Sequence, residues 1–398
     1  MRHEAFASAP TCVVAIPVRD EVERIGDCLR ALAAQRGAAV DHVVLLLNNC
    51  TDGTADAVRA LQPFLAFAIT CAERQYPPET AHAGTARREA MQIAAAIAGP
   101  HGILLTTDAD GQVAPGWLAA NLDALALGAE VVCGRAECNA IEATNIPAYL
   151  HEDDAVEVAY GTVLDRIHDL VDPDPDDPWP RHTEHSGASI AVTVRAWARA
   201  GGVPALPSGE DRGFLAALRR VDVPIRHAPE VLVTVSGRTQ GRAPGGMAET
   251  IARRMIRQDE MLDDSLEPAA DCLRRARARA ALRRLFDRPR VAGAARMDGC
   301  RSPAPAAACA LLARQVGLPP ELVARWLDEP CFGAAWARLE AESPVLVRRP
   351  VRRDELAIHR AAADAIVLSL LDGSDPGQDR ARPVIHLRQQ DPAASDIA

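Results

Sequence analysis

Two pairs of carboxylates stand at points of the sequence where they could carry out chemistry. Asp108 and Asp110 come directly after the apolar segment 102–106. Two carboxylates one residue apart can share Mg²⁺ or Mn²⁺, because these cations prefer oxygen ligands and bridge phosphates. Glu210 and Asp211 begin an expected helix farther along the chain. This second pair could supply a general base, which must lie within hydrogen-bond reach of an acceptor hydroxyl.

Both pairs also have an ordinary structural interpretation. Acidic residues in a turn, as at 108–110, commonly form an Asx turn that caps the next helix. Acidic residues at a helix N-terminus, such as Glu210 and Asp211, stabilise the helix through its macrodipole. A functional site is therefore indicated only if further suitable groups gather at the same place.

Further polar groups follow the first two apolar segments, 11–18 and 41–47. They include Arg19, Asp20 and Glu21 beside Pro17, and then Asn49 and Asp52. Asp52 could cap the helix that follows it, or it could hydrogen-bond a base or a ribose. In an open α/β sheet, ligands bind at the carboxyl ends of the strands, so these groups would lie on one side of the sheet.

Arginines that could bind phosphate occur in two glycine-containing segments. Arg87 and Arg88 lie in A-G-T-A-R-R, whereas Arg238 and Arg242 lie in S-G-R-T-Q-G-R-A-P-G-G. The guanidinium group offers bidentate geometry to phosphate oxygens. All 44 basic residues of the chain are arginine, so the alternative for any one of them is a solvated surface position.

The 398 residues contain no lysine, and this excludes several mechanisms. A Walker A phosphate loop needs a lysine, and Schiff-base enzymes need a lysine amine. The net charge of −10 argues against nucleic-acid binding, which is usually the work of a basic domain. Ten cysteines without metal-type spacing favour reduced thiols and a cytoplasmic location. The sequence shows no apolar run typical of a signal peptide or a membrane span.

Alternating strand and helix patterns predict an α/β fold. Short apolar runs indicate strands, and apolar residues at helical spacing indicate helices. The predicted strands are 11–18, 41–47, 64–72, 102–106, 130–133, 189–194 and 231–235. The predicted helices among them are 20–34, 54–61, 84–98, 115–127, 154–170, 195–200 and 209–220. This alternation is typical of βαβ units and a mainly parallel sheet.

The pattern becomes helical near residue 246. Helices are predicted at 247–262, 268–286, 303–316, 320–328, 333–341 and 354–371. We therefore expect a catalytic domain at 1–245, an α-helical domain at 246–372 and a disordered tail at 373–398.

Three other segments suggest particular roles. The proline-rich segment 172–180 and the glycine-rich segment 237–246 are candidate lids. The arginine-rich helix 268–290 could contact an acidic membrane surface. The favoured alternative is that this helix packs its apolar side on the catalytic domain.

Taken together, several motifs resemble those of soluble bacterial family 2 glycosyltransferases with the GT-A fold. They are V-A-I-P-V-R-D-E, N-C-T-D-G-T, G-T-A-R-R, T-T-D-A-D-G-Q-V-A-P-G-W-L, G-A-S-I-A-V-T-V-R-A-W-A-R-A-G-G and S-G-E-D-R-G-F-L. The resemblance covers residues 11–240 in order and spacing. It implies a mixed, mainly parallel sheet and an inverting, metal-dependent enzyme. Such an enzyme moves a sugar from a nucleotide-diphosphate donor to an acceptor hydroxyl.

The resemblance also implies roles on the nucleotide side of the site. Pro17 and Glu21 would line the nucleotide pocket, together with Arg19 and Asn49. Asp52 would hold the uracil or the ribose. UDP-linked donors are favoured because they are common in the family.

The resemblance places the metal and the diphosphate at the next strand. Asp108 would contact the ribose and the metal, and Asp110 would be the main ligand of Mg²⁺ or Mn²⁺. Arg87 is the better phosphate candidate of its pair, because its neighbour stands where the family often has asparagine. Arg238 or Arg242 would help to stabilise the leaving group.

On the acceptor side, the resemblance makes Asp211 the catalytic base. Glu210 would support it or bind the acceptor, and residues 187–189 would border the acceptor site. The sequence T-V-S-G-R lacks the late histidine that many GT-A enzymes use as a metal ligand. The metal would then be held mainly by Asp110 and the diphosphate.

Two alternatives stay open. A non-catalytic member of the fold would bind a nucleotide sugar or a partner protein. A nucleotidyltransferase on a related sheet is disfavoured by the missing lysine. The acceptor could be a small molecule, a glycan or a lipid-linked compound reached by peripheral membrane contact.

Overall fold

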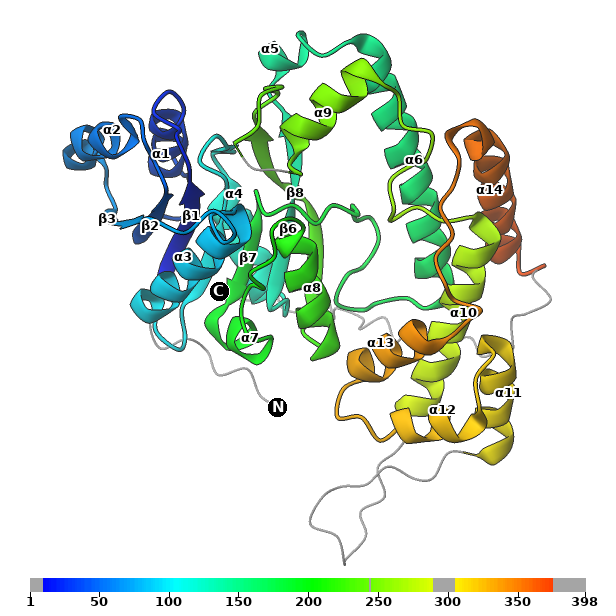
Figure 1. Cartoon of the computed structure of the whole chain (residues 1–398). Helices are drawn as coiled ribbons and strands as arrows, with labels where there is room; N and C mark the ends of the chain where they lie inside the picture. The colour runs from blue at the N-terminus through cyan, green and yellow to red at the C-terminus, as the bar shows by residue number, and fades with distance from the viewer. Residues whose placement is uncertain (1–9, 243–244, 289–304, 375–398) are drawn as a thin grey trace, which may run out of the picture.

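The computed structural model describes residues 10–242, 245–288 and 305–374 (Figure 1). A sheet with flanking helices is formed by the N-terminal half, and a group of helices stands beside it. The predicted disordered tail, 373–398, lies outside the described residues from residue 375 onward. The predicted domain boundary at 245 stays a prediction.

In the described residues, one mixed sheet has the strand order β3-β2-β1-β4-β7-β6-β8-β5. The pairs β3–β2, β2–β1, β1–β4 and β6–β8 are parallel, and the other three pairs are antiparallel. The strands are β1 (Cys12–Val18), β2 (His42–Asn48), β3 (Ala68–Arg74), β4 (Ile103–Thr106), β5 (Gln112–Val113), β6 (Val131–Cys138), β7 (Ile190–Thr193) and β8 (Ile225–Val235). The predicted α/β fold with a mainly parallel sheet is confirmed.

Helices cover both faces of the sheet, because side chains of each strand alternate between two cores. In β1, Val14 and Ile16 enter one core, and Val13 and Ala15 enter the other. The first core includes α1 (Ile25–Ala33), α2 (Thr54–Leu61) and α4 (Trp117–Ala126). The second includes α3 (Ala83–Ala98), α7 (Val194–Arg199) and α8 (Glu210–Arg220). Because β1, β2 and β4 are parallel, their carboxyl ends lie at the same edge of the sheet.

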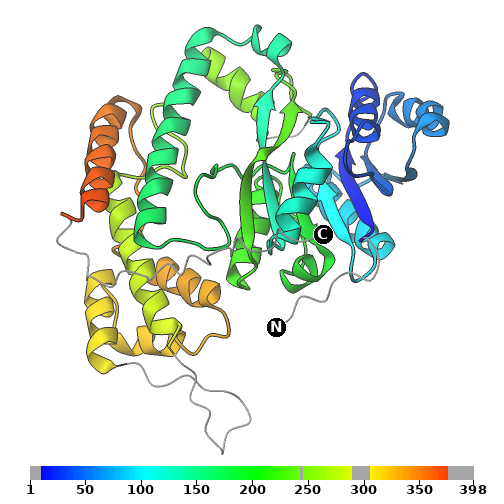
Figure 2. The ribbon, with the colours of Figure 1, turned by 180° about the vertical axis from the view of Figure 1, so that it is seen from behind.

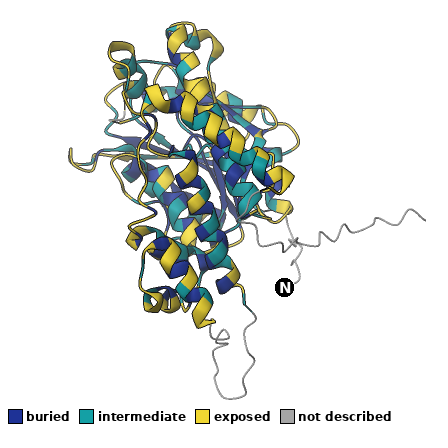
Figure 3. Ribbon diagram, turned by 90° about the vertical axis from the view of Figure 1, so that its right-hand side faces the viewer, coloured by how far each residue is buried: buried dark blue, intermediate teal, exposed yellow. Residues whose placement is uncertain are grey.

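The remaining long helices share two further cores. Helix α6 (Ala148–Val171) lies between β6 and β7 in the sequence, yet it packs against α10 and α14 through Tyr160 and Leu164 (Figure 2). A last core joins α10 to α11, α12 and α13. The helices are α10 (Ala269–Phe286), α11 (Ala306–Val316), α12 (Pro320–Trp326), α13 (Phe332–Glu342) and α14 (Leu356–Asp372). On the outer helices, buried and exposed residues occupy opposite sides (Figure 3).

The arginine-rich helix α10 differs from its predicted environment. Its buried residues contact α6, α11, α13 and α14, so its apolar side packs mainly among helices rather than on the sheet. Among the residues that the structure describes, every helix is too short or too polar to span a membrane.

Element ends differ from the prediction where charge or proline interrupts an apolar pattern. Strand β8 begins at Ile225 rather than 231, although Arg226 and Pro229 break its apolar run. Its partner β6 shifts register between Cys133 and Arg135, around a glycine that leaves no room for a side chain. Helix α9 (Met247–Ile256) stops before 262. The short elements β5 and α5 (Ala140–Ala143) escaped prediction because they span too few residues to show a period.

Candidate active site

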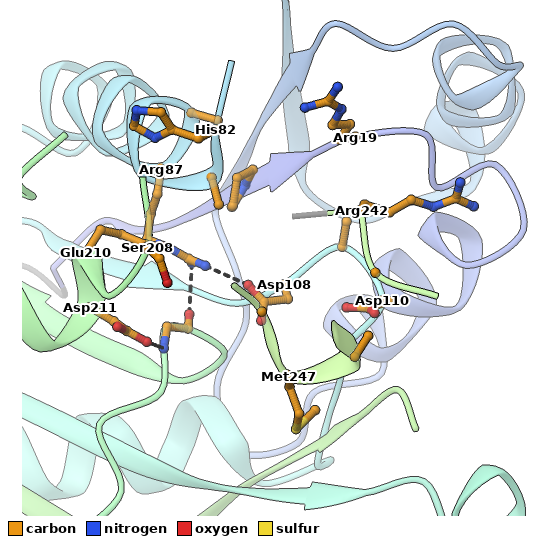
Figure 4. A pocket seen from close by; sticks show the side chains of 18 of the residues that line it. Arg19, His82, Arg87, Asp108, Asp110, Ser208, Glu210, Asp211, Arg242 and Met247 are labelled. Atoms are coloured by element: carbon orange, nitrogen blue, oxygen red, sulfur yellow. Dashed lines mark hydrogen bonds and ion pairs between the residues drawn. The ribbon is translucent and has the colours of Figure 1, made fainter. Parts of the chain in front are cut away.

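A polar cavity of about 370 Å³ opens at the carboxyl edge of the sheet (Figure 4). It is lined from the ends of β1, β2 and β4, from the N-termini of α3 and α8, and from segment 235–248. Cavities of this size hold small-molecule ligands. The predicted site residues that line it are Pro17, Arg19, Glu21, Arg87, Asp108, Asp110, Glu210, Asp211, Arg238 and Arg242.

A carboxylate ties the ends of β1 and β2 together beneath the cavity. Asp20 has a left-handed backbone with φ of 52°. Its Oδ1 accepts hydrogen bonds from the backbone N–H groups of Thr51 at 2.7 Å and Asp52 at 3.3 Å. The neighbouring backbone N–H of Glu21 donates to Thr54 Oγ1 at 2.9 Å. Asp20 therefore fixes the two strand ends relative to each other.

Arg87 is buried and joins four groups around the cavity. Its Nη2 lies 2.6 Å from Asp108 Oδ1, and its Nε lies 3.1 Å from Glu210 Oε1. Its Nη1 donates to Thr106 Oγ1 at 2.6 Å and to the Gly187 carbonyl at 2.9 Å. The predicted phosphate contact would compete with these acceptors, so the structure favours a positioning role for Arg87.

Arg238 connects the glycine-rich segment to two other carboxylates. Its Nη1 and Nη2 donate to the two carboxylate oxygens of Glu21 at 2.9 and 2.6 Å. Nη2 also lies 3.1 Å from Asp110 Oδ2. Burial, Asp108 and Glu21 raise the pKa of Asp110 to about 6, although Arg238 lowers it. Asp110 is thus a carboxylate held among like charges, which a bound cation would relieve.

The predicted base lies at the start of α8, after Gly209, whose φ of 71° favours glycine. Asp211 Oδ2 accepts a hydrogen bond from the Gly187 N–H at 2.9 Å. A Cβ at position 187 would lie 2.8 Å from the Arg87 guanidinium, so a side chain there would displace it. Through its N–H and its carbonyl, Gly187 therefore connects Asp211 with Arg87, two side chains that Figure 4 labels.

Two residues predicted to bind the nucleotide, Asn49 and Asp52, do not line the main cavity. Asn49 exchanges two 2.9 Å hydrogen bonds with the backbone of Tyr76 and points away from the cavity lining. Asp52 accepts hydrogen bonds from the backbone N–H groups of Thr54 and Val22. Asp52 and Arg242 line a smaller depression beside the main cavity. Both side chains hold the turn after β2, and their predicted contacts with the nucleotide stay predictions.

Asn48, rather than its neighbour Asn49, lines the main cavity. It is the last residue of β2, lines the main cavity and is 2% exposed. Its Nδ2 donates to the His82 carbonyl at 3.4 Å, whereas its buried Oδ1 has no protein partner. The alternation of β2 could have identified Asn48, because Leu47 belongs to the apolar core. His82, Ser208 and Met247 also line the cavity and gave no recognisable sequence signal (Figure 4).

The two candidate lids differ. Segment 172–180 is anchored away from the cavity: Asp172 binds Arg279 and Arg283, and Asp177 binds His227. None of its residues, all of which are described, lines the cavity, so the lid prediction for this segment is wrong. The glycine-rich segment 237–246 does contribute to the cavity lining, through Arg238, Gly241, Arg242, Gly245 and Gly246.

A comparison with family models concerns the N-terminal part of this site. Residues 13–160 match the model described as glycosyl transferase family 2. Residues 13–160, which include most of β1, all of β2 and β4, Asp108 and Asp110, therefore resemble a family 2 glycosyltransferase.

Solved structures similar to this chain include three complexes. A mannosyltransferase from Pyrobaculum calidifontis with GDP-Man and Mn²⁺ is 17% identical, covering 92% of this chain and 88% of its own, with a TM-score of 0.40. S. aureus TarS 1–349 with UDP-GlcNAc is 15% identical, covering 91% and 92%, with a TM-score of 0.44. Glucosyl-3-phosphoglycerate synthase from Mycobacterium tuberculosis with Mn²⁺, UDP and glucosyl-3-phosphoglycerate is 14% identical, covering 63% and 80%, with a TM-score of 0.35. None of the curated proteins compared with the chain matches it.

Three histidines, His182, His185 and His227, form a cluster outside the cavity lining. His227 Nδ1 lies 2.6 Å from Asp177 Oδ2, and its ring makes edge contacts with His182 and His185. Burial lowers the pKa of His227, but Cys133 and Asp177 raise it to about 9. Burial lowers the pKa of His182 to about 4. These contacts indicate a structural role for the three histidines.

Proposed function

We propose that the cavity binds a nucleotide-diphosphate sugar and that Asp211 activates an acceptor hydroxyl. The observation that carries this proposal is the meeting of Asp108, Asp110 and Asp211 in one cavity. Asp108 and Asp110 follow β4, whereas Asp211 lies about a hundred residues later in the first turn of α8. The arrangement supplies both an oxygen-rich cation site and a candidate base.

The charges of the cavity fit a divalent cation. Five arginines and five carboxylates line it, so the lining is neutral as a whole. A diphosphate would add negative charge that these pairs do not offset. Asp108 and Asp110 would hold Mg²⁺ or Mn²⁺ through oxygen ligands. When bound, the cation would stabilise negative charge on the leaving diphosphate.

The residues of this chain then have distinct tasks. Asp211 accepts the proton of the acceptor hydroxyl, whose oxygen forms a bond to the anomeric carbon. The bond from that carbon to the diphosphate oxygen breaks, and its electron pair leaves with the diphosphate. In-line attack inverts the anomeric configuration. The N–H of Gly187 orients Asp211, and Arg87 holds Asp108 and Glu210 in place.

Arg238 has a second task on donor binding. Arg238 neutralises Glu21 and Asp110. A cation at Asp110 would release part of this guanidinium for the diphosphate oxygens. Arg242 lines the same cavity and would add positive charge at its edge.

Asn48 is the proposed contact for the nucleobase. Its unpartnered Oδ1 needs a hydrogen-bond donor, because a buried acceptor without one carries a desolvation cost. The N3–H of uracil supplies such a donor, and UDP sugars remain the favoured donors.

Thermal unfolding of the purified protein with UDP, GDP, CDP or dTDP, each with and without Mn²⁺, tests the donor site. Ligand binding to the folded state raises the melting temperature by mass action. We expect a metal-dependent rise with one nucleotide. If folded protein responds to none of them, the non-catalytic, partner-binding alternative would replace this proposal.

A further inference from the structure

Helix α8 runs from the cavity to the C-terminal helices. Its first turn carries Glu210 and Asp211, which line the cavity. Its last turn is followed by Asp222, which lies at the N-terminus of α13. The two helices contact each other although they are more than 100 residues apart in the chain.

The contact is made by one carboxylate that caps α13. Asp222 Oδ2 accepts the N–H of Phe332, and Oδ1 accepts the N–H of Gly333, both at 2.7 Å. The first N–H groups of a helix lack partners within the helix and attract negative charge. Asp222 itself has a φ of 49°, a conformation that aspartate and asparagine tolerate better than most residues.

The backbones of α8 and α13 also touch directly. A Cβ at Gly333 would lie 1.7 Å from the Arg219 carbonyl oxygen and 3.0 Å from the Arg220 Cα. Any side chain at position 333 would therefore push the two helices apart. The close approach of α8 and α13 therefore requires glycine at position 333.

Helix α13 is a firm support because its first residue is fixed by the helical core. Phe332 is buried and packs edge-on against Phe286, with ring centroids 5.7 Å apart. The guanidinium of Arg283 lies 4.1 Å from the Phe332 ring centroid, and the same arginine binds Asp172. The N-terminus of α13 is therefore held from several sides.

A second link returns from the end of α8 to the cavity. Arg219 Nη2 lies 2.9 Å from His185 Nε2. His185 stands two residues before Gly187, whose N–H binds Asp211. A displacement at the end of α8 would therefore reach Asp211 both along the helix and through the segment 185–187.

We propose that Asp222 is a positioning residue through which the C-terminal helices hold α8 and aim Asp211 at the acceptor. This inference rests on the proposed function, because it takes Asp211 as the base. It gives the C-terminal helices a catalytic purpose without any contact between them and the sugar donor.

Asp222→Asn tests the inference, because asparagine tolerates the same backbone but loses the charge and one acceptor oxygen. A misplacement of about 1 Å can cost roughly a hundredfold in rate. We expect kcat to fall by about tenfold or more, with donor KM within about twofold of the wild-type value. Gly333→Ala should act in the same direction. The matched control is Asp364→Asn, which removes an exposed pair with Arg360 on α14 and should leave kcat unchanged.

Hydrogen exchange provides a readout that does not depend on activity. The amides of 210–220 should exchange faster in Asp222→Asn than in the wild type or in Asp364→Asn. Wild-type kcat together with wild-type exchange in α8, in folded Asp222→Asn protein, would overturn the inference. A lower melting temperature with unchanged kcat would do the same. If the wild type transfers no sugar, the proposed function fails, and the exchange comparison still decides whether Asp222 holds α8.

Discussion

The two sides of the cavity use the same residue type in different ways. Arg87, on α3, has a side chain that is 6% exposed and binds groups from four parts of the chain. The side chain of Arg238, on the glycine-rich segment, is 19% exposed, and its partners among the described residues are two carboxylates of the cavity, Glu21 and Asp110. A buried arginine with backbone and side-chain partners, such as Arg87, holds separate parts of the fold together. An arginine that neutralises carboxylates at the cavity edge is able to exchange them for a ligand.

Arg87→Met should give the largest loss. Removal of this guanidinium leaves Glu210 and Asp108 without their cation. Breaking a buried ion pair in this way costs about 3–5 kcal/mol, and transfer should be lost with it. Urea unfolding measures the difference. Arg88→Met is the matched control, because Arg88 makes a single hydrogen bond to the Val203 carbonyl. Equal destabilisation by both substitutions would contradict the positioning role.

Arg238→Gln should affect donor binding more than folding. The substitution leaves Glu21 and Asp110 with less compensation, and we expect a stability loss of about 1–2 kcal/mol. Donor KM should rise by about tenfold, which corresponds to about 1.4 kcal/mol. Steady-state kinetics and urea unfolding separate the two effects. A destabilisation as large as that of Arg87→Met, with unchanged donor KM, would remove the difference between the two arginines.

The histidine cluster makes the fixed side of the cavity sensitive to pH. The pKa of His227 is about 9 in the folded protein, above its ordinary value of 6.5. The folded state therefore binds more protons than the unfolded state between these values. The stabilisation is complete below pH 6.5 and is lost as the pH rises through about 9.

Urea unfolding between pH 6 and pH 9.5 checks this dependence. His227→Gln should reduce the slope between pH 7 and pH 9.5. His182→Gln should keep the slope over this range, because His182, with a folded-state pKa of about 4, is largely neutral there in both the folded and the unfolded state. A pH-independent stability for the wild type would show that Asp177 does not hold His227 in its charged form.

Asn48→Ala should give the smallest effect of the series. It removes one hydrogen bond to the nucleobase, so nucleotide Kd should rise by about fivefold, or roughly 1 kcal/mol. Calorimetry with the nucleotide identified by thermal unfolding measures this change. Asn49→Ala is the control and should leave Kd unchanged. The opposite ranking of the two variants would return the nucleotide contact to Asn49.

The sequence predicted the strands, their polar ends and the general place of the site because these follow from local patterns. The apolar run before Asp108 and the acidic start of α8 are visible in a few residues. Pairings between distant segments have no such local sign. The four partners of Arg87 could not be read from spacing, because they depend on which distant side chains face the same space. Asn48, by contrast, could have been chosen over Asn49 from the alternation of β2.

The same limit explains the error over segment 172–180. Its prolines and aspartates predict an irregular loop, which is correct, but an irregular loop is not therefore a lid. Asp172 and Asp177 instead anchor it to α10 and β8. The hydrogen bonds between Asp222 and the N-terminus of α13 could not be predicted either, because Asp222 follows α8 and its partners lie about 110 residues later in the chain.

Sugar transfer by Asp211→Asn tests the central claim most directly. The variant is compared with the wild type for product formation from the donor identified by thermal unfolding, and for binding of the same nucleotide. The account predicts that transfer falls by at least about a hundredfold while nucleotide binding stays at the wild-type level. Transfer at the wild-type rate would contradict the account and remove Asp211 from the role of base.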